Sequence, residues 1–123
     1  MAQLLFVGGT RAMKHDDPSS GIKHFQQVVG LAERLQPLGV AIYYHEWYCL
    51  VMGSWSFVAG SRHQSYRFTW DGREGWISVF GPFHASEGVG SRAPHIITDR
   101  LGFGATIDPL KYVETFFEKN RAA

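Results

Sequence analysis

The feature that most constrains the fold is residues 39–83, which are dense in β-branched and aromatic side chains. Such side chains favour extended strands. Residues 40–52, 54–59, 66–70 and 76–80 form four strand-like runs, and segments that contain glycine separate them. Short runs joined by short turns are typical of an antiparallel sheet, so we expect four to five antiparallel strands.

Residues 65–80 give the clearest local prediction, a β-hairpin. Aromatic residues alternate with polar ones on both sides of an Asp-Gly dipeptide, which is typical of hairpin turns. Pairing Asp71 with Glu74 places Phe68 opposite Ile77. One face of the hairpin then carries Tyr66, Phe68, Trp70, Ile77 and Val79, and the other carries Arg67, Thr69, Trp76, Ser78 and Phe80. A loop of another even length keeps the same division of faces.

Residues 40–52 form a longer run in which both sets of alternate residues are largely apolar. A strand with two apolar faces is either central in its sheet or covered on both sides. His45 and Glu46 interrupt the run. We favour a strand break that leaves both side chains in water. The alternative is a strand in which one of the two is buried with a shifted pKa. Whether the run is one strand or two stays open.

Two amphipathic helices flank these strands in the sequence. Over residues 18–36, and again over 109–120, apolar side chains recur every three or four positions after an Asp-Pro pair. Residues 81–106 are rich in glycine, and we interpret them as an irregular loop with one strand-like stretch at 95–97. The chain is therefore predicted to be a single α+β domain, residues 1–123, with the sheet and the helices in two layers.

Composition excludes several classes of protein. With 123 residues, 45% of them hydrophobic and 19% charged, the chain can bury a core and is not intrinsically disordered. Its net charge of +1 provides no overall field for nucleic acid or membranes. Cys49 is the only cysteine, so no disulfide can form within the chain. The first apolar run is too short for a signal peptide, and we expect a cytoplasmic protein without membrane contacts.

The sequence contains no recognisable catalytic, cofactor or metal motif. Its six histidines lack the spacing that places two imidazoles on one helical turn. The glycine-serine motif of α/β-hydrolases and the phosphate-binding glycine loop with its lysine are also absent. We therefore assign no catalytic residue, no cofactor and no metal ligand, and leave enzymatic activity open.

The second face of the predicted hairpin combines aromatic and basic side chains, namely Arg67, Trp76 and Phe80. Tryptophan and arginine are enriched where proteins bind one another. We therefore expect a non-enzymatic binding protein that meets a protein partner, or a second copy of itself in a dimer, through this face. Weak binding of single-stranded nucleic acid is an alternative, since stacking and positive charge serve it too, but the low net charge argues against it.

A small-ligand site is the other alternative. Its pocket would lie between the sheet and the loop at 81–106, with polar groups from His45, Glu46, His84 and Arg92. His95, in the same loop, is a further candidate. A glycine-rich loop can close over a ligand, and an arginine suits a carboxylate or a phosphate.

Overall fold

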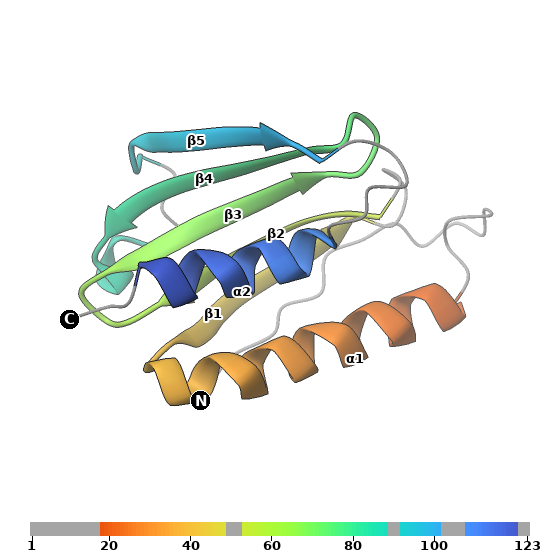
Figure 1. Cartoon of the computed structure of the whole chain (residues 1–123), viewed down its shortest axis with the longest axis horizontal. Coiled ribbons are helices and arrows are strands. Elements are labelled where there is room, and N and C mark those ends of the chain that lie inside the picture. Colours follow the sequence, from red (N-terminus) through yellow and green to blue (C-terminus); the bar gives the residue numbers. More distant parts are fainter. Residues whose placement is uncertain (1–17, 49–52, 89–91, 102–107, 121–123) are drawn as a thin grey trace.

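The chain folds into one antiparallel sheet and two α-helices, an α+β architecture (Figure 1). The computed structural model describes residues 18–48, 53–88, 92–101 and 108–120. In chain order the elements are α1 (Pro18–Leu35), the short helix η2 (Gln36–Leu38), β1 (Ala41–Tyr48), β2 (Ser54–Gly60), β3 (Ser65–Asp71), β4 (Trp76–Phe83), the short helix η3 (Ala85–Glu87), β5 (His95–Arg100) and α2 (Pro109–Lys119). Each strand pairs antiparallel with the next one in the chain, so the sheet order is β1-β2-β3-β4-β5.

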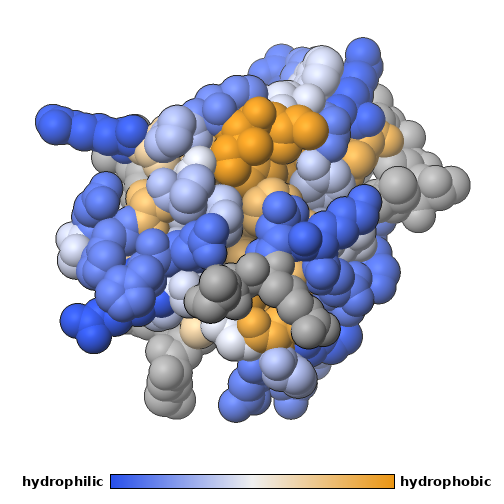
Figure 2. Space-filling view, turned by 60° about the vertical axis from the view of Figure 1, so that its left-hand side comes forward, coloured by the Kyte–Doolittle hydropathy of each residue, from blue (hydrophilic) through white to orange (hydrophobic). Residues whose placement is uncertain are grey.

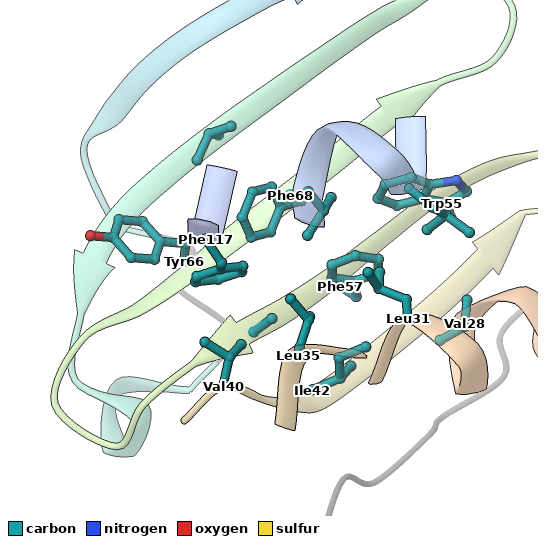
Figure 3. Packing of buried hydrophobic residues seen from close by; sticks show 14 of the residues in the cluster. Val28, Leu31, Leu35, Val40, Ile42, Trp55, Phe57, Tyr66, Phe68 and Phe117 are labelled. Carbon is teal, nitrogen blue, oxygen red and sulfur yellow. The ribbon is translucent and has the colours of Figure 1, made fainter. Parts of the chain in front are cut away.

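Both helices pack on the same face of the sheet, which gives the two layers that the sequence predicts (Figure 1). They contribute buried side chains at three- and four-residue spacing: Val28, Leu31 and Leu35 from α1, and Leu110, Val113 and Phe117 from α2. These meet Phe57 of β2 and Phe68 of β3, which are both fully buried (Figure 3). The ring centroids of Phe57 and Phe68 lie 5.7 Å apart, and those of Phe68 and Phe117 lie 5.5 Å apart. The main hydrophobic cluster of the described residues therefore lies between the helices and one sheet face.

Local signals explain where the helices begin and end. The Oδ1 atom of Asp108 accepts a hydrogen bond from the backbone N–H of Leu110 at 2.8 Å, and Pro109 occupies the first helical position of α2. Gly39 has a φ of 75°, a left-handed conformation that costs glycine little and that closes η2. Both predicted helices are confirmed, with ends within one residue. Neither described helix has the length and apolar character that crossing a membrane requires.

The hairpin of β3 and β4 confirms the predicted faces but not the predicted pairing. Asp71 pairs with Trp76 rather than with Glu74, and Phe68 pairs with Val79. The reason is the side chain of Asp71, whose Oδ1 atom accepts hydrogen bonds from the backbone N–H groups of Arg73 and Glu74, each at 3.0 Å. This geometry lengthens the loop by two residues. An even shift leaves every side chain on the face expected for it.

β1 is one continuous strand, so the predicted break at His45 and Glu46 is wrong. Its ladder with β2 runs through both residues. His45 is fully buried on the helix side of the sheet, and Glu46 points to the opposite face. β1 also lies at one edge of the described sheet, so the first of the two alternatives for this run, a central position, is not observed. Residues 49–52 of the same run lie outside the described residues.

A β-bulge explains why this run shows no clean alternation. Ile42 pairs with Ala59 and Tyr44 pairs with Val58, which leaves Tyr43 as an extra residue. Beyond the bulge the strand exchanges its faces. Ile42 therefore points into the core and Tyr44 points to the opposite side, although residues two positions apart share a face in a regular strand.

Residues 81–106 are more regular than predicted. β4 continues to Phe83, η3 follows it, and β5 covers residues 95–100 instead of 95–97. Pairing with β4 explains the difference, because it supplies partners that a local pattern cannot reveal. Residues 89–91 and 102–107 of this predicted loop lie outside the described residues.

Two glycines of α1 give a matched test of how α1 packs on β1. A Cβ atom at Gly21 would lie 2.7 Å from the ring of Trp47, whereas one at Gly30 would lie 3.3 Å from the movable guanidinium group of Arg34. Because alanine favours a helix, we expect Gly30→Ala to raise the free energy of unfolding by about 0.5–1 kcal/mol. We expect Gly21→Ala to lower it by about 1–3 kcal/mol, because the tryptophan must shift. Urea unfolding measures both, and equal gains would contradict this packing.

Candidate functional site

The sheet face opposite α1 and α2, which we call the helix-free face, carries mainly polar and aromatic residues, and all five strands contribute to it. The registers give it Tyr44, Glu46 and Tyr48 from β1, Ser54, Ser56 and Val58 from β2, Arg67 and Thr69 from β3, Trp76, Ser78 and Phe80 from β4, and His95, Thr98 and Arg100 from β5. The side chains of β2 are buried, whereas most of those on β4 and β5 are partly or fully exposed. Contact with another molecule is therefore easiest over β4 and β5.

Arg67, Phe80 and His95 form one row across this face. The guanidinium carbon of Arg67 lies 4.3 Å from the centre of the Phe80 ring, within the range of a cation–π contact. The ring of His95 lies 5.2 Å from the same ring on its strand neighbour. The Nε atom of Arg67 is buried and has no hydrogen-bond acceptor within the described chain. Three of the predicted site residues are thus brought together.

A second arginine repeats this arrangement at the other end of β4. Arg100 pairs with Trp76 across the strands, and its guanidinium carbon lies 5.5 Å from the indole ring. Trp76 is 38% exposed, a large fraction for a tryptophan. Sequence patterns predict Trp76 on this face, whereas they leave Arg100 in the loop at 81–106, where an arginine is expected to suit a carboxylate or a phosphate. The β-branched residues at 96–98 were the available signal for a strand.

A row of hydroxyl groups separates the two arginine–aromatic pairs. Ser56 and Thr69 lie 3.4 Å apart, and Ser78 and Thr98 lie 2.9 Å apart, measured between their hydroxyl oxygens. The Nε2 atom of His95 lies 2.7 Å from the same hydroxyl oxygen of Thr98. These groups can donate or accept hydrogen bonds, so the middle of the face suits polar backbone or side-chain groups of a partner.

Glu46 is held in place by two tyrosines of its own strand. The hydroxyl groups of Tyr44 and Tyr48 each donate a hydrogen bond to its carboxylate. Burial, together with the hydrogen bond and the charge of Glu46, raises the pKa of Tyr44 to about 12. The phenol therefore stays protonated at neutral pH. This cluster adds an acidic group to the β1 side of the helix-free face.

His45 lies on the other side of the sheet, in the core. Its Nε2 atom lies 2.9 Å from that of His24 on α1, and the ring of Trp47 stacks on His24 with a centroid distance of 5.1 Å. Burial lowers the pKa of His24 to about 4, against the opposing charge of Asp108. Burial also lowers the pKa of His45 to about 3, and His24 adds to that shift. Both imidazoles are neutral at pH 7, and one donates to the other.

The residues predicted for a loop pocket do not form one site. His45 is buried in the core, Glu46 lies on the helix-free face, and Arg92 is exposed. His84 caps η3, where its Nδ1 atom accepts from the N–H group of Ser86 at 3.1 Å. Among the described residues, no three side chains of histidine, cysteine, aspartate or glutamate are grouped so as to hold a metal ion.

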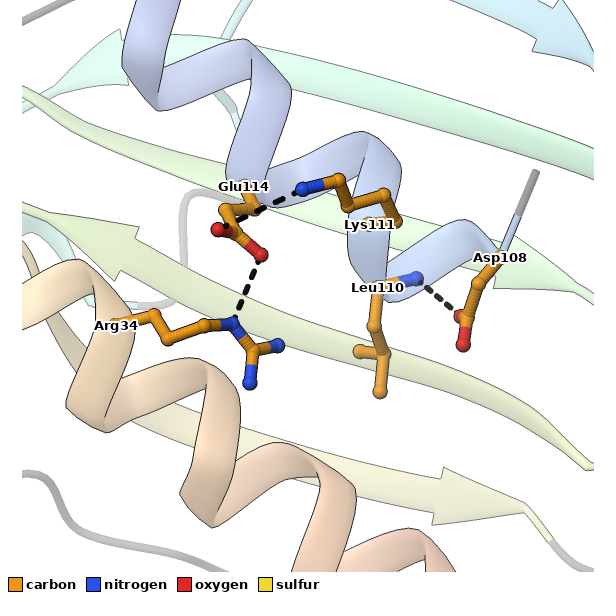
Figure 4. Close-up of polar contacts among 5 residues, drawn as sticks. All are labelled: Arg34, Asp108, Leu110, Lys111 and Glu114. Atoms are coloured by element: carbon orange, nitrogen blue, oxygen red, sulfur yellow. Dashed lines mark hydrogen bonds and ion pairs between the residues drawn. The ribbon is translucent and has the colours of Figure 1, made fainter.

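A polar groove of about 540 Å³ lies between α1 and α2 on the opposite side of the molecule. Figure 4 shows its ion pairs: Glu114 contacts the Nε atom of Arg34 at 2.9 Å and the ammonium group of Lys111 at 3.7 Å. Two cations thus already contact the Glu114 carboxylate, and Lys23 and Asp108 also line the groove. The ion pair between Arg34 and Glu114 joins α1 to α2.

A shallow apolar hollow of about 420 Å³ on α1 is a different kind of surface. Ile22 and Val29 line it and are 61% and 47% exposed. Figure 2 shows an apolar patch that hydrophilic side chains surround in the upper half of its view, whereas α1 lies in the lower part of Figure 1, so this patch is separate from the hollow. Such patches mark contact surfaces, but they do not identify a ligand.

Comparison of the chain with protein-family models, with curated proteins and with solved structures gives no significant match. The chemistry of the site must therefore be inferred from its geometry.

The buried histidine pair predicts how stability depends on pH. Both folded-state pKa values lie below the ordinary value of 6.5, so the unfolded chain binds protons first as the pH falls. The contribution of the pair is complete above pH 6.5 and is lost as the pH falls from about 6.5 toward the folded-state pKa values of about 4 for His24 and about 3 for His45. We expect each histidine to lower the free energy of unfolding by up to about 1.4 kcal/mol per pH unit in this range.

Urea unfolding at pH 7, 6 and 5 measures this slope. His24→Gln removes one of the two groups and is expected to make the slope shallower. His63→Gln is the matched control, because His63 is exposed and should leave the slope unchanged. An unaltered slope in His24→Gln would rule out the buried pair as its cause.

Proposed function

We propose that this chain is a non-enzymatic binding protein that holds an acidic protein partner on its helix-free face. The strongest support is the pairing of two guanidinium groups with two aromatic rings, Arg67 over Phe80 and Arg100 over Trp76. Neither arginine forms an ion pair with a described residue, unlike Arg34. Both guanidinium groups lie over apolar rings and have no carboxylate partner among the described residues. We therefore expect carboxylates of another molecule to bind them.

The physical argument rests on how a stacked guanidinium binds. An arginine that lies over a ring has lost part of its side-chain freedom already, so less is lost when it binds a carboxylate. Its N–H groups, which lie in the guanidinium plane, can bind two carboxylate oxygens at once. The rings beside it offer apolar contact, and Trp76 is 38% exposed. Tryptophan and arginine together are typical of the residues that dominate protein interfaces.

The charge pattern favours a protein over a nucleic acid. The net charge is +1, and Glu46 places a carboxylate on the β1 side of the same face. A phosphate backbone needs a continuous basic stripe and would be repelled at this side. A protein surface can instead present acidic groups to the β3–β5 side and donors to the β1 side.

Selection from a displayed library of random peptides tests the proposal with defined probes. Peptides selected on the wild-type protein are expected to be acidic. Their dissociation constants are expected to rise at least tenfold for the double variant Arg67→Gln, Arg100→Gln, which corresponds to about 1.4 kcal/mol. Isothermal titration calorimetry measures the affinity, and thermal unfolding checks that the variant is folded.

The matched control is Lys23→Gln, Lys119→Gln, which removes the same charge from exposed sites on the two helices. It should leave peptide affinity within about twofold. Peptides that bind both double variants equally, or that carry no acidic residues, would contradict the proposal. Tight and salt-sensitive binding of an oligothymidylate would favour nucleic acid instead.

A further inference from the structure

β5 has one unpaired edge in the described sheet. It pairs with β4 and with no other strand, and it forms the outer boundary of the sheet in Figure 1. Five of its six residues are exposed, including Ile96 at 46% and Ile97 at 38%. An edge strand with exposed β-branched side chains is a template for pairing with a further strand.

The hydrogen bonds to β4 show which backbone groups of β5 are free. The N–H group of Leu101 donates to the carbonyl oxygen of Gly75 at 2.7 Å. Gly75 and Leu101 continue the register of Trp76 and Arg100. Gly75 and Leu101 are therefore a hydrogen-bonded pair. Hydrogen-bonded and non-hydrogen-bonded pairs alternate in an antiparallel ladder, so Trp76 and Arg100 are a non-hydrogen-bonded pair.

This alternation fixes the direction of each backbone group along residues 97–100. Ile97 and Asp99 direct their N–H and C=O groups toward β4, and Thr98 and Arg100 direct theirs away from it. The bulge between β4 and β5 falls before Ile97, so these four residues are regular. Asp99 is also fixed from the core side, since the hydroxyl group of Tyr112 on α2 donates to it at 2.5 Å. The outward N–H and C=O groups of Thr98 and Arg100 are thus held in the geometry that pairing with a further strand requires.

We propose that a second copy of this chain occupies this edge, with the two β5 strands paired antiparallel about a two-fold axis at Thr98. Three two-fold registers use the outward groups of Thr98 and Arg100. One register sets Asp99 opposite Asp99 of the second copy, and another sets Arg100 opposite Arg100. Both are unfavourable, because like charges then lie directly opposite each other. The remaining register sets Thr98 opposite Thr98 of the second copy.

In that register the two Thr98 residues exchange both N–H···O=C bonds, which satisfies the free groups of both edges. Ile97 and its copy become diagonal neighbours across the axis, so their exposed apolar surface is reduced. The two sheets merge into one, and the two helix-free faces lie side by side. The dimer goes beyond the proposed partner binding, because it needs neither Arg67 nor an acidic partner.

Sedimentation velocity of the full chain at 1–100 µM tests this inference. We expect the wild type to form a dimer that dissociates on dilution. Thr98→Pro removes an N–H group that points away from β4, so it should preserve the ladder within the chain and raise the dimer dissociation constant at least tenfold. Thr98→Val keeps the N–H group and loses only the hydroxyl, and it should dimerise like the wild type. A wild type that stays monomeric, or a Thr98→Pro variant that dimerises as well, would overturn the proposal.

Charge variants test the register even if the proline variant fails to fold. Thr98→Lys and Thr98→Asp each place like charges opposite each other on the axis, so each alone should be mainly monomeric. Mixed in equal amounts, the two should form a heterodimer, because opposite charges then face each other. Absence of the heterodimer, measured by sedimentation at low salt, would exclude this register.

Discussion

The contact between Phe57 and Phe68 is the interaction on which the rest of the structure depends. Both rings are fully buried on adjacent strands, and Phe117 of α2 packs against Phe68. Because the apolar stripes of both helices meet this cluster, both helices lie on one side of the sheet. No described helix lies on the opposite side. The helix-free face is thus a consequence of where the core forms, and its exposed residues on β4 and β5 can contact other molecules.

Ionisable groups have different environments on the two sides of the sheet. On the core side, His24 and His45 are kept neutral by burial and share one hydrogen bond. On the helix-free face, Glu46 is bound by two tyrosine hydroxyl groups, and two arginines lie over aromatic rings. The two imidazoles of the core are therefore uncharged, whereas Glu46 and the two arginines lie on the face that is proposed to bind. The division between His45 and Glu46, which are adjacent in the chain, follows directly from strand geometry.

The proposed partner site and the proposed dimer edge are neighbours. Arg100 belongs to both, since its side chain lies on the helix-free face while its backbone N–H and C=O groups point to the free edge of β5. Pairing through backbone groups would leave its guanidinium group and Trp76 available for a partner. A dimer would double the number of arginine–aromatic pairs on one continuous surface, and two linked sites increase the strength of binding to a partner that engages both.

The sequence by itself determined the elements that local patterns specify. Helical spacing and the Asp-Pro pairs located both helices, and simple alternation assigned Arg67, Trp76 and Phe80 to one face of a hairpin. These signals act between residues that are close in the chain. The turn pairing at Asp71 was missed because a side-chain hydrogen bond changed the loop length without changing the faces.

Only the tertiary structure decided the features that depend on residues far apart. The bulge at Tyr43 appears when β1 is aligned with β2, and it determines which side chains of β1 are buried. β5 is a strand because β4 supplies its hydrogen-bond partners, and Arg100 joins the site for the same reason. His45 is buried because α1 supplies His24 as its partner. In each case a pairing partner distant in sequence makes the arrangement stable, and no local pattern contains it.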